Sequence, residues 1–138
     1  MGEDLLRRLV RAHGQLPEGC RSAPAREDEV RAFESRFGPI PPEYRWYLTV
    51  CGGGVVGCEW VKGIKELPGT HIKFISEPWT MKDVFVIGWD GGGNPFGIER
   101  GSGRLLVEDH NSGGVHMMAS SFIDFLSAGL LRDDAHPS

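Results

Sequence analysis

Short runs of β-forming residues, separated by glycine-rich turns, dominate the second half of the chain. The runs cover residues 84–89, 95–99 and 104–108, and a fourth covers residues 115–119. Glycine, aspartate and asparagine fill the gaps between them, and tight turns need these residue types. Strands and turns at this spacing are typical of an antiparallel meander. We therefore expect the fold to be organised around residues 84–111.

Helical periodicity replaces that pattern towards both ends of the chain. Apolar residues recur three and four positions apart, and Ser121 stands three residues before Asp124, as in a helix cap. The same spacing makes Cys51 a small core residue. The predicted helices run from Leu5 to Gly14, from Ala25 to Phe37 and from Pro42 to Cys51, and a last one begins near Phe122 and carries Phe125 and Leu126 inward.

The other segments complete the expected architecture. Residues 15–24 predict a loop, residues 55–61 a strand, and residues 62–83 an irregular connection with room for one strand at 71–75. We expect a single domain over residues 1–138, with a flexible tail at 132–138. The fold class is α+β, a twisted, mainly antiparallel β-sheet with helices packed on one face.

The composition indicates a soluble globular protein. The 138 residues include 40% hydrophobic and 25% charged residues, as in soluble globular proteins. We expect a cytoplasmic protein, because no long apolar run or signal peptide is visible and the three cysteines, an odd number, form no disulfide framework.

The net charge of −4 is unevenly placed, because residues 1–45 carry eight acids and eight bases whereas residues 46–138 carry eleven acids and seven bases. Such a balance disfavours nucleic acid and membranes as partners and mildly favours a cationic one.

The glycine run at residues 90–94 admits two interpretations. A phosphate loop would precede a helix and usually supply a lysine, but the next residues predict a strand and no lysine is near. The alternative is an architectural turn, in which glycine permits a positive φ and Asp90 and Asn94 bond the backbone. We favour the turn.

Two other kinds of site can be assembled from this half of the chain. Asp109, His110 and His116 could bind a metal with Asp90 or Cys58, but no pair has the close spacing of known metal motifs. Asp90, Glu108 and Asp109 could act as paired carboxylates, but the sequence shows no cleft or nucleophile motif. We therefore expect no metal, no cofactor and no catalytic residue.

Among the tryptophans, Trp79 is the one expected to be exposed and to face a partner, because it lies beside Pro78 in the irregular connection. For the others we expect core positions, and Trp60 and Trp89 lie in predicted strands. A stacking platform for bases would need a basic groove, and this half of the chain is acidic.

Four motifs in order resemble the SUKH superfamily, and more closely its Smi/Knr branch, named for a yeast cell-wall assembly regulator. The resemblance runs from about residue 27 to residue 130. It is carried by Ile40–Leu48 with Cys51–Gly54, by Ile87–Asn94, by Gly103 with Val107–His110, and by Ala119–Leu126. The signature positions are Asp90, Gly92, Gly93, Asn94, Asp109 and His110.

This resemblance implies an α+β fold and binding rather than catalysis. Many bacterial members of the family resemble immunity proteins, which neutralise toxins, often nucleases, passed between competing cells. Fungal relatives act as intracellular regulatory scaffolds. We expect an immunity protein that binds a cationic toxin domain, as a monomer or weak dimer; the alternative is a regulatory module that binds an endogenous partner. The expected partner-binding residues are Trp79, Asp90, Glu99, Glu108 and Asp109.

Overall fold

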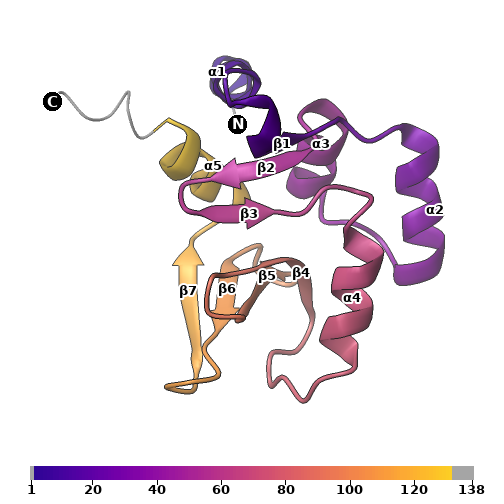
Figure 1. Ribbon diagram of the computed structural model, residues 1–138, viewed down its shortest axis with the longest axis vertical. Coiled ribbons are helices and arrows are strands. Elements are labelled where there is room, and N and C mark those ends of the chain that lie inside the picture. Colours follow the sequence, from indigo (N-terminus) through magenta and orange to yellow (C-terminus); the bar gives the residue numbers. More distant parts are fainter. Residues whose placement is uncertain (1, 132–138) are drawn as a thin grey trace, which may run out of the picture.

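Two antiparallel sheets and five α-helices make up the protein in a computed structural model, which describes residues 2–131 (Figure 1). The α+β expectation is confirmed. The helices are α1 (Glu3–Gly14), α2 (Glu27–Phe37), α3 (Pro42–Val50), α4 (Leu67–Ile75) and α5 (Phe122–Leu130), with a short 3₁₀ turn, η1, at Glu18–Cys20. The strands are β1 (Arg21–Ser22), β2 (Gly53–Val56), β3 (Glu59–Val61), β4 (Val84–Trp89), β5 (Pro95–Glu99), β6 (Leu105–Glu108) and β7 (Val115–Ala119).

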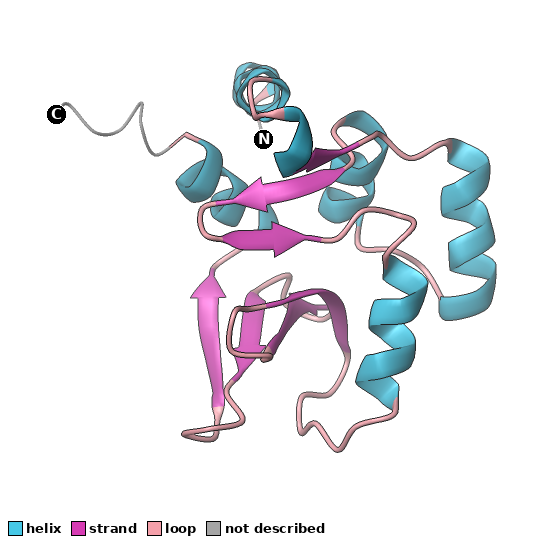
Figure 2. Ribbon diagram, viewed as in Figure 1, coloured by secondary structure: helices cyan, strands magenta, loops and turns pink. Residues whose placement is uncertain are grey.

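The predicted meander is the larger sheet. Its four strands lie in the order β4-β5-β6-β7, and each pairs antiparallel with the next. The second sheet, of order β1-β2-β3, lies beside it in Figure 2. The two sheets meet where the N–H of Lys62, just after β3, donates to the carbonyl of Ile87 on β4 at 2.9 Å.

Three local expectations were wrong. Residues 55–61 form a hairpin, because Gly57 adopts φ of +66° and reverses the chain. The loop at 15–24 contains η1 and β1. Residues 71–75 are the second half of helix α4, in which Pro68 occupies the first turn, where a missing N–H costs nothing.

Gly52 shows why the second sheet can form. The backbone carbonyl of Ser22 would lie 2.3 Å from a Cβ at this position, and Gly52 has φ of +118°. No other residue tolerates both the close contact and the left-handed backbone. The glycine therefore lets the segment after β1 cross directly over the end of helix α3.

The core lies between the helices and the two sheets. Tyr44, Tyr47, Phe85 and Phe122 are almost fully buried, and the ring of Phe122 lies 5.4 Å from those of both tyrosines. Helix α5 thus packs on α3, and it also contacts α1. The predicted cap of α5 is confirmed, since Ser121 Oγ accepts from the N–H of Asp124 at 3.1 Å. Cys51 is buried as expected, and burial raises the pKa of its thiol to about 11.

Candidate functional site

The turn between β4 and β5 is built around the side chain of Asp90. Its Oδ1 accepts from the N–H groups of Gly92 and Asn94, both at 2.9 Å, and its Oδ2 accepts from Asn94 Nδ2 at 3.1 Å. Gly93 has φ of +82°, which L side chains rarely adopt. Strand β5 follows directly, so the turn lacks the helix N-terminus that a phosphate loop uses. The glycine run is therefore architectural.

Asn94 joins this turn to the one that follows β6. Its side chain is 8% exposed, and its Oδ1 accepts from the backbone N–H of His110 at 2.9 Å and also contacts His110 Nδ1. Because the amide oxygen can only accept, Nδ1 carries the proton in this contact. Two signature motifs that are 16 positions apart are thus held together by one buried amide.

Asp109 shapes the second turn in the same way. Its Oδ1 accepts from the N–H groups of Asn111 and Ser112 at 2.8 and 3.2 Å, and its Oδ2 accepts from Ser112 Oγ at 2.8 Å. The Ser112 hydroxyl and these backbone donors hold the pKa of Asp109 below its ordinary value. The carboxylate stays ionised but is largely occupied within its own turn.

Glu108 does not belong to the surface, contrary to expectation. It is 8% exposed, and its carboxylate accepts from the N–H groups of Thr80 and Met81 and from Thr80 Oγ1, at 2.8–3.0 Å. Burial on its own would raise the pKa of Glu108, but the donors from Thr80 and Met81 lower it below the ordinary value. Glu108 therefore anchors the segment that enters β4 and is not available to a partner.

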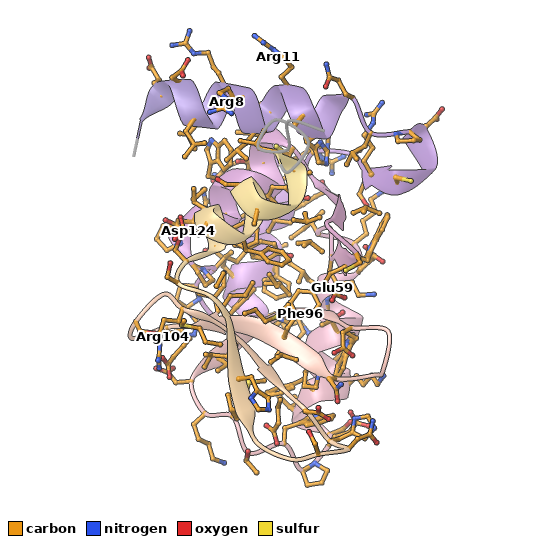
Figure 3. All side chains as sticks on the ribbon, turned by 90° about the vertical axis from the view of Figure 1, so that its left-hand side faces the viewer. Arg8, Arg11, Glu59, Phe96, Arg104 and Asp124 are labelled. Atoms are coloured by element: carbon orange, nitrogen blue, oxygen red, sulfur yellow. The ribbon has the colours of Figure 1, made fainter. Side chains whose placement is uncertain are left out.

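Glu99 is also occupied. Its Oε1 accepts from Ser102 Oγ at 2.5 Å and from Arg104 Nη2 at 2.8 Å. The Ser102 hydroxyl and then Arg104 lower the pKa of Glu99. In Figure 3 Arg104, the ion-pair partner of Glu99, lies at the left of the view and Glu59 at the right, so Glu99 lies away from Glu59.

Trp79 and Trp89 form an aromatic pair beside the two turns. Their rings are 6.1 Å apart, and the ring of Trp79 lies 6.2 Å from that of His110. Trp79 is half-buried rather than exposed, because these neighbours cover part of it. Its Nε1 donates to Glu77 at 3.2 Å, and Lys73 Nζ sits 4.3 Å from the centre of the Trp89 ring. The ring of Trp89 therefore already binds a cation, and the edge of the Trp79 ring already binds a carboxylate.

Glu59 is the acidic neighbour that the sequence did not reveal. It lies on β3, which contacts β4 just before Asp90, and burial and then the charge of Asp90 raise its pKa. We call the surface formed by Glu59, Trp79, Trp89, Asp90 and His110 the turn face. It combines half-exposed aromatic rings with carboxylates from two sheets, and the proximity of Glu59 to Asp90 depends on tertiary packing.

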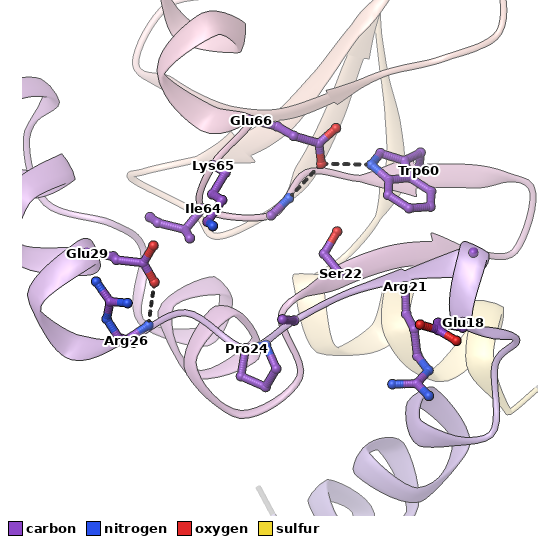
Figure 4. Close-up of a pocket in the computed structure, with 13 residues that line it drawn as sticks. Glu18, Arg21, Ser22, Pro24, Arg26, Glu29, Trp60, Ile64, Lys65 and Glu66 are labelled. Atoms are coloured by element: carbon purple, nitrogen blue, oxygen red, sulfur yellow. Dashed lines mark hydrogen bonds between the residues drawn. The ribbon is translucent and has the colours of Figure 1, made fainter.

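Two pockets lie away from the turn face. One, of about 580 Å³, is lined by the start of α2 and the segment after β3 (Figure 4). Two of its three glutamates are internally occupied, since Glu66 accepts from Trp60 Nε1 at 3.0 Å and Glu29 from the N–H of Arg26 at 2.9 Å. The other, of about 370 Å³, is mainly apolar and has Ile98 and Phe122 in its wall. In the first pocket, no hydrogen bond joins the hydroxyl of Ser22 to a side chain that could act as a base.

Metal-binding chemistry has no support among residues 2–131, where no group of three His, Cys, Asp or Glu side chains could hold an ion. The absence of a cofactor or metal stays a prediction. Within the same described part, no helix combines the length and apolar character needed to cross a bilayer.

The comparisons with known proteins place the chain in a family. A family model described as the SMI1 / KNR4 family (SUKH-1) matches residues 24–128. No curated protein matches the chain. The matched stretch contains both signature turns, the tryptophan pair and helix α3. The chain therefore belongs to the SMI1 / KNR4 family (SUKH-1), within the SUKH superfamily.

Proposed function

We propose that this protein is a non-enzymatic immunity protein that binds a cationic toxin domain, such as a nuclease, through the turn face. The observation that carries the proposal is the tryptophan pair with its carboxylates. Lys73 over the Trp89 ring, 4.3 Å from its centre, is a pairing that an arginine or lysine of a partner could repeat on Trp79. Half-exposed tryptophans are frequent anchors of protein interfaces.

Charge supports the same partner. Residues 83–111 contain five acids and two bases. The carboxylates of Asp90, Glu99, Glu108 and Asp109 are occupied internally, so the acidity available at the turn face comes from Glu59, with Glu77 beside Trp79. A nuclease binds phosphates with lysine and arginine side chains, and an acidic protein surface can bind the same side chains.

Co-expression with the toxin encoded beside this gene tests the proposal. Growth should be rescued, and Trp79→Ala should abolish the rescue and weaken binding about tenfold or more. Ile75→Ala is the matched control, because Ile75 is apolar, 73% exposed and only four positions away. Equal loss of binding in both variants, or in neither, would contradict the turn face.

Charge reversal separates electrostatic attraction from contact. Glu77→Lys should slow association, more at low than at high salt. Asp4→Lys makes the same change of charge at an exposed residue of helix α1, so the association rate should stay unchanged.

The alternative is a regulatory module that binds an endogenous protein. The internal occupation of Glu99, Glu108 and Asp109 favours it, since it leaves less free negative charge to attract a strongly basic toxin. The regulatory function replaces the immunity function if two results are obtained together. No toxin is encoded nearby, and affinity capture that depends on Trp79 recovers host regulatory proteins.

A further inference from the structure

Strand β7 is the open edge of the larger sheet. It pairs with β6 on one side, and in Figure 1 no other described element lies along its second side. Figure 3, which views the molecule from that side, shows β7 in front with no helix across it. Val115 and Met117 on this strand are 42% and 58% exposed, and His116 is also exposed.

The register of β7 shows which backbone groups point outward. The N–H of Asp109 donates to the carbonyl of Gly114 at 3.0 Å, and the same register pairs Val107 with His116. Antiparallel strands alternate between pairs that exchange hydrogen bonds and pairs that do not. His116 therefore bonds inward to β6, and the N–H and C=O groups of Val115 and Met117 face away from the sheet.

The outward positions of the strand carry no protecting residue. Natural edge strands often carry proline, charged residues such as lysine, or a bulge, and these prevent pairing with another chain. β7 reads VHMMA and contains no Asp, Glu, Lys, Arg or Pro. Its one irregularity is a bulge next to Met118, after the three outward positions. A cationic partner would find no carboxylate on this strand, whereas an identical strand would meet no like charge at pH 7, where His116 is neutral.

We propose that β7 pairs antiparallel with β7 of a second copy of this chain, centred on His116. Val115 would then lie opposite Met117 of the second copy, and Met117 opposite Val115. These are the residues whose N–H and C=O groups face outward, so both pairs exchange hydrogen bonds. The apolar side chains of each pair also share one face, because they are two positions apart. The arrangement is closed by a two-fold axis and joins two four-stranded sheets into one.

The interface is small, so the dimer is weak and concentration-dependent. The proposed dimer does not rest on the proposed function, because neither Val115 nor Met117 belongs to the turn face. Sedimentation equilibrium from about 10 µM to about 1 mM spans the range in which a weak dimer forms. The mass of the purified protein should rise from one chain towards two.

Two variants test the edge in different ways. Met117→Lys should weaken the dimer about tenfold or more, because it places a charge in each apolar pair. Met117→Pro removes an outward N–H without removing a bond to β6 and should have the same effect. Ile75→Lys is the control, since it makes the same substitution at a residue that is 73% exposed on another element. Unchanged circular dichroism and denaturant midpoints would show that the variants fold.

A monomer at every concentration would overturn the proposal, and so would a dimer that survives both Met117 variants. Equal weakening by Ile75→Lys would assign the effect to net charge. If the protein is monomeric and the Met117 variants instead lose binding to another protein, the edge serves that partner and self-pairing is wrong.

Discussion

The two edges of the larger sheet differ in how they are covered. At the β4 edge, Lys62 donates to Ile87, His71 Nε2 donates to the carbonyl of Val86 at 2.9 Å, and helix α4 packs alongside. At the β7 edge the described residues place nothing. Both strands are rich in apolar residues, so composition does not decide which edge is covered. What differs is the connection: β3 and α4 precede β4 in the chain and fold back onto it, whereas β7 leads directly into α5 at its end.

The largest change in the free energy of unfolding is expected when one residue on each edge strand is truncated. Phe85 is 1% exposed and its ring contacts those of His71, Tyr44 and Phe33. Phe85→Ala should lower the free energy of unfolding by about 3–5 kcal/mol, because it leaves a cavity. Met117→Ala should change it by no more than about 0.5 kcal/mol, as at ordinary surface positions. Urea unfolding measures both, and similar losses would show that the β7 edge is packed after all.

A smaller effect is expected at the hydrogen bond by which the turn after β4 holds the turn before β7. The turn at residues 90–94 holds Asn94, whose side chain reaches the turn before β7. Gly93→Val should cost about 1–3 kcal/mol, because Val would be forced into a positive φ. Gly91→Val is the control, since a Cβ there meets nothing within 4 Å. Hydrogen exchange should also become faster in residues 109–116 of the Gly93 variant, and unchanged exchange would contradict the link.

The smallest effect concerns pH. Burial lowers the pKa of His71 below its ordinary value of 6.5, despite the bond to Val86. As pH falls through 6.5, the unfolded chain therefore takes up a proton before the folded chain does, and the free energy of unfolding decreases. The decrease should level off below the lowered pKa.

His71→Gln keeps a donor for Val86 but cannot titrate. The difference in urea midpoint between wild type and this variant should therefore shrink or reverse in favour of Gln between pH 7.5 and pH 5, and the other histidines cancel in the comparison. A difference that stays constant over this range would show that His71 is not responsible.

The meander could be predicted because its information is local. Turn residues such as Asp90 and Asp109 act on backbone groups two to four positions away, and the runs between the turns are rich in β-forming residues. The signature residues found in the sequence are, in the structure, the ones that shape these two turns.

Helix α4 and the acidic pair could not be predicted in this way. Leu67-Pro68-Gly69 looks like a turn and Ile72, Phe74 and Ile75 favour strands, but tertiary packing makes this segment a helix with Leu67 and Thr70 buried. The closeness of Glu59 to Asp90 depends on the two sheets meeting, and the burial of Glu108 depends on Thr80 and Met81, 28 and 27 positions away. None of these contacts leaves a local pattern.

The packing of helix α5 on α1 and α3 has a consequence for how the protein is made. Synthesis proceeds from the N-terminus, so α1 and α3 leave the ribosome long before residues 122–130. Until Phe122 arrives, the ring of Tyr47 lacks one of its main contacts and the core stays open. The native packing of α1 and α3 can therefore be completed only after residues 122–130 have emerged.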